Sequence, residues 1–249
     1  LIDAVMTTLD LHDDLHITEG KQGLEFIGPY ASGITADADN LVARALSFVD
    51  RSAHVVVTKN IPHGGGLGGG SADAAAIFRW AQRTSAADVV ASAAIGADVP
   101  FSLLGGTALG TGTGANLEPL PALPQQQVLL VFSTPGLSTA AVFKEFDRLV
   151  PDGDLTMSPK SLQEAFGANL ESILGRNSLA TAAFSLRPDL AGLAGLVPGK
   201  TAYVSGSGPT LFMISEDLSE IEQWQQVFLG HGLKTLVTQT TDRGAELIS

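Results

Sequence analysis

The segment from residue 60 to residue 76 constrains the fold most, because it passes from an apolar run through glycines into alanines. The residues before it, His54 to Lys59, are mostly β-branched and favour a strand. The residues after it, from Ser71 to Trp80, are strong helix formers. Six of the seven positions from 64 to 70 are glycine. The sequence therefore predicts a strand, a glycine loop and a helix that opens near Ser71.

This glycine loop has the composition of an anion-binding site. Glycines adopt positive φ and let an anion approach the backbone without meeting a Cβ atom. The first amides of the following helix have no intrahelical partner, and the helix dipole adds partial positive charge there. These features together predict a phosphate site. The alternative is a flexible linker, but Leu67 in the middle of the loop and the patterned helix after it are not typical of Gly/Ser linkers.

Two common phosphate loops do not fit this segment. A Walker A loop ends in Gly-Lys-Ser/Thr, whereas Gly70 and Ser71 have no lysine between them. The glycines also satisfy G-x-G-x-x-G, the dinucleotide-binding pattern, but Pro62 and His63 separate them from the strand. That pattern further needs a strand ending in an acid about 20 residues on. Asp88 has this distance, yet it lies in an Ala-rich stretch that favours a helix.

Pro62 through Ser71 match without a gap the second signature of the GHMP kinase superfamily, Pro-x-x-x-Gly-Leu-Gly-Gly-Gly-Ser, so the loop resembles those kinases. The flanking residues, Lys59-Asn60-Ile61-Pro62 and Ser71 to Ala75, are similar to the 4-diphosphocytidyl-2-C-methyl-erythritol kinases of non-mevalonate isoprenoid synthesis. The resemblance implies ATP and Mg²⁺ as cofactors, with Ser71 as the metal ligand. The ATP-binding residues it implies are Asn40, Lys59, Pro62, Gly64, Gly65, Gly66, Leu67, Gly68, Gly69, Gly70 and Ser71.

Asp98 is the expected catalytic residue. Its surroundings, from Gly96 to Phe101, are almost free of other charges, where a carboxylate without a partner or a task is unfavourable. The alternative is a helix cap. The string Gly-Ala-Asp-Val-Pro-Phe resembles the family segment whose aspartate takes the proton from the substrate hydroxyl. With a pKa of about 4 such a base is weak, so it would act through its position while metal and amides stabilise the phosphoryl charge.

The substrate-binding residues come from two later stretches. Phe143 lies on a predicted helix, where a phenylalanine commonly belongs to the core. The resemblance implies instead that its ring stacks on cytosine, as aromatic platforms do. The turn from Gly206 to Gly208 is by itself a weak signal, but the resemblance implies that it closes over the phosphates and the substrate. The implied substrate-binding residues are Thr139, Phe143, Gly206, Ser207 and Gly208.

Two of the implied ATP-binding residues have an alternative explanation, and one further asparagine has no assigned role. Asn40 and Lys59 align with family positions that face the adenine, but a helix cap and a solvated strand end explain them equally well. Asn177 lies where the family often has Asn-Asp-Leu, yet Ser178 and Leu179 follow it here, and it receives no role.

Hydrophobic alternation and turn residues outline the remaining elements. Residues 4–11, 14–19 and 24–27 suggest antiparallel strands, with a turn at residues 20–23. The other expected strands are 54–59, 107–111, 116–120, 128–132, 200–205, 210–214 and 233–237. The expected helices are 41–49, 71–80, 86–94, 139–149, 159–166, 177–186 and 218–228. This is a two-layer α+β pattern, and prolines between residues 121 and 135 indicate a domain boundary.

The resemblance implies the two-domain GHMP kinase fold with the active site between the domains. We expect a ribosomal-protein-S5-like ATP-binding domain at residues 1–134 and a ferredoxin-like substrate domain at residues 135–249. The family's first signature, a lysine-bearing strand followed by Asp-Gly-Tyr-His-x-Leu, should end where Leu1 begins. We therefore expect the first strand to be missing and the active site of this sequence to be incomplete. Short segments near residues 50–51 and 83–84 are also expected to be absent.

Composition excludes several classes of function. The formal net charge of −12 opposes binding to nucleic acid or an anionic membrane surface, which clustered Lys and Arg drive. The sequence has no cysteine and five scattered histidines, so thiolate zinc sites and His-rich metal motifs are not expected. No apolar run approaches the roughly 20 residues that span a bilayer. We expect a cytoplasmic protein, monomeric or weakly dimeric, whose partners are ATP and a cytidyl diphosphate substrate.

The resemblance implies an ATP-dependent kinase that phosphorylates the 2-hydroxyl of 4-diphosphocytidyl-2-C-methyl-erythritol. One alternative is another GHMP small-molecule kinase, of the mevalonate or sugar type. The other is a nucleotide-binding homologue without catalysis, because the lysine segment is missing and Ala72 replaces a serine that often follows the loop. The presence of Asp98 argues against this last alternative.

Overall fold

The computed structural model describes residues 3–151, 158–168 and 170–248 and divides them into two compact units. Unit 1 contains the residues up to His63, Gly68–Ala122 and those from Thr241 onward, and unit 2 contains Gly64–Leu67 and Leu123–Thr240. The tip of the glycine loop therefore belongs to unit 2, and the two ends of the loop belong to unit 1. The division into domains at residues 134 and 135 stays a prediction.

A three-stranded sheet carries the glycine loop in unit 1. Its order is β2 (Asp14–Glu19), β4 (Ala53–Thr58), β3 (Gly23–Ile27), with β2 antiparallel and β3 parallel to β4. The predicted strands are present and β2 runs opposite to β3, but the two are not paired with each other, because β4 lies between them. The helix α1 (Leu41–Phe48) makes the crossover from β3 to β4 that a parallel pair requires.

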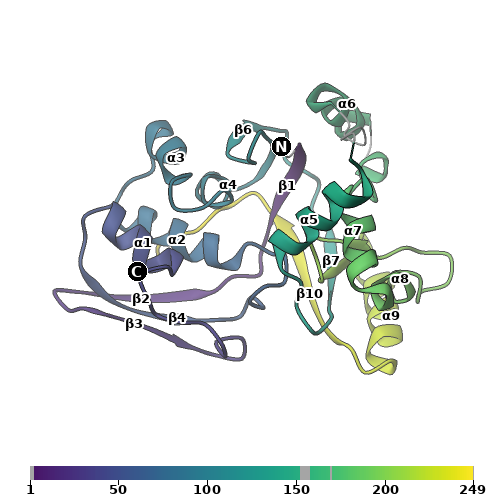
Figure 1. Cartoon of the computed structure of the whole chain (residues 1–249), viewed down its shortest axis with the longest axis horizontal. Coiled ribbons are helices and arrows are strands. Elements are labelled where there is room, and N and C mark those ends of the chain that lie inside the picture. Colours follow the sequence, from purple (N-terminus) through teal and green to yellow (C-terminus); the bar gives the residue numbers. More distant parts are fainter. Residues whose placement is uncertain (1–2, 152–157, 169, 249) are drawn as a thin grey trace. The chain divides into compact units, whose positions relative to one another are not determined.

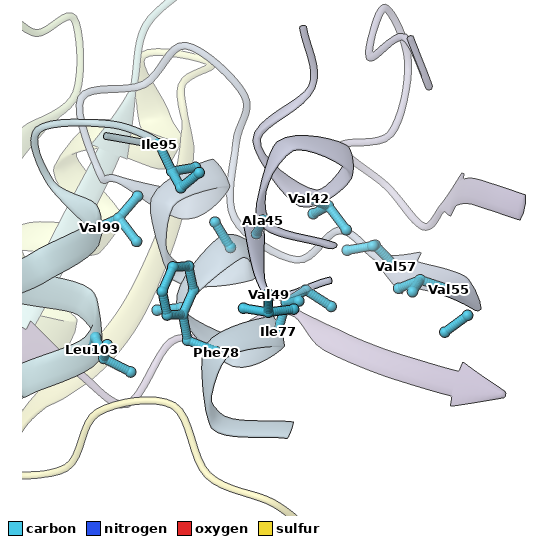
Figure 2. Packing of buried hydrophobic residues seen from close by; sticks show 13 residues of the cluster. Val42, Ala45, Val49, Val55, Val57, Ile77, Phe78, Ile95, Val99 and Leu103 are labelled. Carbon is cyan, nitrogen blue, oxygen red and sulfur yellow. The ribbon is translucent and has the colours of Figure 1, made fainter. Parts of the chain in front are cut away.

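Helices α1 and α2 (Gly69–Trp80) lie over one face of this sheet, as Figure 1 shows. Every second residue of β4 is buried, among them Val55 and Val57, and these side chains meet the apolar faces of both helices. Figure 2 shows Phe78 of α2 between side chains of α1 and Val99 and Leu103 of α4 (Val99–Leu104). Phe78 is fully buried, so the helix that follows the glycine loop is anchored in the core.

The rest of unit 1 is a second set of strands and one short helix. The strand β5 (Thr107–Thr111) pairs antiparallel with β1 (Ala4–Leu9) on one side and β6 (Asn116–Pro119) on the other. The helix α3 (Ala86–Ser92) begins at a capping box formed by Ser85 and Asp88. Our predictions did not include α4, whose proline in the first turn suits a helix start.

Among the described residues, four strands and five helices lie in unit 2. The strand order is β10 (Lys234–Thr241), β7 (Gln127–Phe132), β9 (Leu211–Ser215), β8 (Tyr203–Val204), with antiparallel pairs throughout. The helices are α5 (Thr139–Leu149), α6 (Pro159–Ala168), α7 (Leu179–Leu186), α8 (Pro188–Ala194) and α9 (Leu218–Gly230), and Leu170–Ser172 form a 3-10 turn. The predicted bounds of α5 are confirmed, whereas the strand predicted at residues 200–205 is only β8.

The core of unit 2 joins three of its strands to three of its helices. The strands β7, β8 and β9 supply Leu129, Val131, Val204, Leu211 and Met213, and α7, α8 and α9 supply Ala183, Ala194, Ile221, Trp224 and Phe228. The described helices and strands of both units match the predicted α+β class.

Candidate active site

The glycine loop connects β4 to α2, and α2 begins at Gly69, two residues before the predicted Ser71. Gly64, Gly66 and Gly68 have φ of +68°, +74° and +68°, in the left-handed region that favours glycine. Gly68 occupies the N-cap of α2, and because it has no side chain it leaves the first helical amides available to an anion. A Cβ on Gly64 or on Gly68 would meet no described atom within 4 Å, so space is open beside each.

Two other glycines of the loop allow close packing. A Cβ on Gly66 would lie 2.6 Å from the carbonyl oxygen of Ser205, and a Cβ on Gly69 would lie 2.9 Å from Cγ2 of Ile61. The hydroxyl of Ser205 donates a hydrogen bond to the carbonyl oxygen of Gly66 (2.9 Å). Within unit 2 the tip of the loop therefore lies against the turn that the sequence indicated at residues 206–208.

That turn also contacts the predicted substrate helix. The hydroxyls of Thr139, at the start of α5, and Ser207 are 3.0 Å apart and hydrogen-bonded. Phe143, one turn further along α5, is half-buried, whereas its neighbour Val142 is completely buried. Val142 is thus the core residue here, whereas Phe143 is only partly buried. The substrate roles of these residues stay predictions.

Asn177 and Arg187, to which the sequence assigned no role, bind the backbone of the segments around residues 204–206 and 133–135. Asn177 donates from Nδ2 to the carbonyl oxygens of Val204 (2.9 Å) and Gly206 (2.7 Å), and its Oδ1 accepts from the amide of Leu179 (3.0 Å). An asparagine just before a helix is a recognisable cap signal, but its bonds to residues 27 and 29 positions away are not readable from sequence.

Arg187 is the second of these residues. It donates to Oγ of Ser133 (2.7 Å), to the carbonyl oxygen of Thr134 (3.2 Å) and to that of Pro135, and it pairs with Asp189. Its guanidinium therefore joins three consecutive residues just before the predicted substrate helix. Arginine suits this task because its five donors have a fixed geometry.

Asp98 occupies the N-cap position of α4, but within the described part of the chain its side chain makes no capping bond. The helix cap that we considered as the alternative role is therefore not what its carboxylate does. The residue is exposed, yet the surrounding protein removes part of the water from its carboxyl, and this desolvation raises the pKa of Asp98. The helix that follows Asp98 is tied to α2, because Nη2 of Arg79 donates to the carbonyl oxygen of Leu103 (2.7 Å).

Lys59 is not the solvated strand end that we considered as its alternative role. It is 3% exposed, and its ammonium donates to Oδ2 of Asp13 and to Oδ2 of Asp73 (2.6 Å). Its backbone amide and carbonyl bond to Ile27 and Tyr30, so little of Lys59 is available to a nucleotide. Burial raises the pKa of Asp73 to about 7, against the opposing effect of Lys59.

Asn40 caps α1, since its Oδ1 accepts from the amide of Val42 (2.9 Å). Ser71 is buried in the first turn of α2. The adenine contact of Asn40 and the metal contact of Ser71 stay predictions. Among the described residues no group of three His, Cys, Asp or Glu gathers as a metal cage. The helices described are all too short or too polar to cross a membrane.

Comparisons with known proteins identify the family. The model of the GHMP kinases N terminal domain matches residues 40–106, which include the glycine loop and Asp98. The 4-diphosphocytidyl-2-C-methyl-D-erythritol kinase of Paracoccus denitrificans is 38% identical over 230 residues, covering 89% of this chain and 81% of the relative. The enzyme of that name from Corynebacterium efficiens is 36% identical over 275 residues, covering 98% and 86%. The chain belongs to the 4-diphosphocytidyl-2-C-methyl-D-erythritol kinase family.

Solved structures agree with membership of this kinase family. A crystal structure of 4-(cytidine 5'-diphospho)-2C-methyl-D-erythritol kinase is similar with a TM-score of 0.75 and 27% identity, covering 96% of this chain and 89% of that one. The L. major mevalonate kinase, at a TM-score of 0.68 and 14% identity over 98% and 90% of the two chains, shares the fold. The predicted family and GHMP kinase fold are confirmed. As a member of the 4-diphosphocytidyl-2-C-methyl-D-erythritol kinases, the chain is an ATP-dependent phosphotransferase that acts on a hydroxyl group.

Proposed function

We propose that this kinase transfers the γ-phosphoryl group of ATP to the 2-hydroxyl of 4-diphosphocytidyl-2-C-methyl-D-erythritol, a step of non-mevalonate isoprenoid synthesis. The names of the relatives support this substrate. The structural observation that carries the proposal lies within unit 2. There the tip of the glycine loop meets the turn at Ser205 to Gly208 through Gly66, and the same turn bonds to Thr139 through Ser207. Predicted phosphate-binding and substrate-binding residues are thus direct neighbours.

In this mechanism the loop from Gly64 to Ser71 binds the phosphates through its amides and the N-terminus of α2. Asp98 accepts the proton of the attacking hydroxyl as that oxygen bonds to the γ-phosphorus. The bond from the γ-phosphorus to the bridging oxygen breaks, and ADP leaves. The ring of Phe143 stacks on the cytosine and so selects the substrate.

The residues of the loop fit a magnesium nucleotide. Mg²⁺ is usually held by one or two protein groups together with substrate phosphates and water, rather than by a cage of carboxylates. Ser71, in the first turn of α2, is the hydroxyl that would hold it, and space is open at Gly68, the N-cap of the same helix. The chemistry that Mg²⁺ supplies when bound is neutralisation of the phosphate charge.

We also propose that the protein is cytoplasmic and monomeric or weakly dimeric, with domains at residues 1–134 and 135–249.

The test is an assay of the full-length protein with ATP and Mg²⁺ against three acceptors, the cytidyl substrate, mevalonate and galactose. ADP formation and the mass of the product are measured. We expect a mass gain of one phosphoryl group on the cytidyl substrate only. Turnover of mevalonate or galactose in preference would assign the chain to another branch of the superfamily. ATP binding without turnover of any acceptor would identify a non-catalytic nucleotide-binding protein.

A further inference from the structure

Three charged side chains form a buried triad in unit 1, with Lys59 between Asp13 and Asp73. The side chains are 3%, 1% and 3% exposed, respectively. Such groups lose their hydration on folding, and replacing buried ion pairs by apolar residues is often neutral or stabilising. Stability alone is therefore a poor explanation for three buried charges. Their position relative to the glycine loop supplies a better one.

The triad connects the two ends of the loop. On the incoming side, Oδ1 of Asp13 accepts from the amides of Asn60 (2.5 Å) and Ile61 (2.8 Å), the residues that precede Pro62. On the outgoing side, Asp73 lies in the first part of α2, four residues after Gly69. Lys59, just after β4, donates to both carboxylates and so joins the two sides.

Backbone packing brings the same two ends together. A Cβ on Gly69 would lie 2.9 Å from Cγ2 of Ile61 and 3.5 Å from Oδ2 of Asp13. The start of α2 thus packs directly against the incoming end of the loop and against the triad. Four of the seven residues between Ile61 and Gly69 are glycine, which has more conformational freedom in the unbound state than any other residue.

We infer that Asp13, Lys59 and Asp73 are positioning residues that hold the ends of the glycine loop at the separation its amides need to bind the phosphates of ATP. This inference rests on the proposed function, because the loop has to bind ATP for the triad to act on it. A loop with fixed ends loses less conformational freedom when it binds, so its affinity is higher. The triad also gives Lys59 and Asp73, on the two flanks of the loop, a role that direct contact with the phosphates does not explain.

The variant Asp73→Ala tests this inference in the full chain. It releases α2 from Lys59 while the Lys59–Asp13 pair, whose formal charges balance, remains. Asp88→Ala is the matched control, because it is the same change in the same unit. It removes the ion pair with Arg83 (2.6 Å) and the capping box of α3, and it leaves the contacts of the glycine loop unchanged. Thermal unfolding identifies a temperature at which both variants are folded.

ATP affinity by calorimetry and the KM values for both substrates are then measured. We expect Asp73→Ala to weaken ATP binding about tenfold to a hundredfold, the range that small misplacements of binding groups produce, and to raise the KM for ATP more than that for the acceptor. Asp88→Ala should bind ATP like the wild type. Asp73→Asn keeps an oxygen for Lys59 and should recover most of the affinity.

Equal ATP affinity in Asp73→Ala and the wild type would overturn the inference, as would equal weakening in Asp88→Ala. If Asp73→Ala does not fold, Asp73→Ser takes its place, since it keeps a polar group that is too short to reach Lys59. Failure of the proposed function gives a different result, because then the wild-type chain itself does not bind ATP or phosphorylate the cytidyl substrate.

Discussion

The hydroxyl of Ser205 donates a hydrogen bond to the carbonyl oxygen of Gly66, a residue 139 positions earlier in the chain. This bond holds the tip of the glycine loop against the turn that contains Ser207. The packing around it is as close as a glycine permits, so it can be tested by adding a single methyl group.

Gly66→Ala should weaken ATP binding. Its Cβ would lie 2.6 Å from the carbonyl oxygen of Ser205 and 3.1 Å from that of Gly208, so the loop tip must move. The control is Gly20→Ala, outside the loop, where φ is also +74° but no described atom lies within 4 Å of the added Cβ. Left-handed backbone costs about 1–3 kcal/mol of stability in either variant, so a loss of ATP affinity in Gly66→Ala alone reports the crowding at the loop tip. Calorimetry with ATP that ranks the two variants equally would contradict this explanation.

Phe143→Ala should raise the KM for the cytidyl substrate by a factor that corresponds to roughly 1–3 kcal/mol, because a stacked base loses its platform. ATP affinity should stay close to that of the wild type. Phe143→Leu separates stacking from packing, since it keeps an apolar side chain but no ring. Steady-state kinetics in which Phe143→Leu matches the wild type would show that the ring is not the binding element.

Asp98→Asn should keep the fold and bind both substrates, since the amide has nearly the shape of the carboxylate. Turnover should fall by about 10²–10⁴-fold, the usual contribution of a general base, with little change in KM. Near-normal turnover in this variant would remove Asp98 from the mechanism.

The pH dependence of the wild-type enzyme should report the same residue. Desolvation raises the pKa of Asp98 from 3.8, and the base acts only when deprotonated. Activity should therefore be lost as pH falls through a pKa higher than the ordinary 3.8 of an aspartate. The acidic side of the pH profile of kcat/KM gives the pKa of the base. If that pKa is the one of an ordinary aspartate, the desolvated carboxyl of Asp98 is not the base.

The free energy of unfolding should also depend on pH through Asp73. Its pKa is raised to about 7 in the folded chain, mainly by burial, whereas the ordinary value is 3.8. Between these two values the folded state binds one more proton than the unfolded state, so the contribution of Asp73 lowers stability as pH rises. Asp73→Asn removes this contribution. The free energy of unfolding, measured with urea, should fall less between pH 5 and pH 7 in Asp73→Asn than in the wild type. An equal fall in both proteins would be inconsistent with the raised pKa of Asp73.

Local chemistry was enough to predict the parts of the site that depend on neighbouring residues. The strand, glycine loop and helix around residues 54–80 follow from β-branched residues, from the positive φ that Gly64, Gly66 and Gly68 require, and from helix propensity. The cap at Asn40 and the bounds of α5 are equally local, and the structure has both. The family resemblance rests on the same contiguous stretches.

Tertiary structure decided the features that join residues far apart in the chain. Alternation shows that β2 and β3 each have a buried face, but not that β4 lies between them. The sequence left Lys59 as either a nucleotide contact or a solvated strand end, because its burial depends on Asp13 and Asp73, which are 46 and 14 positions away. A buried ammonium is stable only where partners surround it, and a sequence does not state which partners the fold will bring.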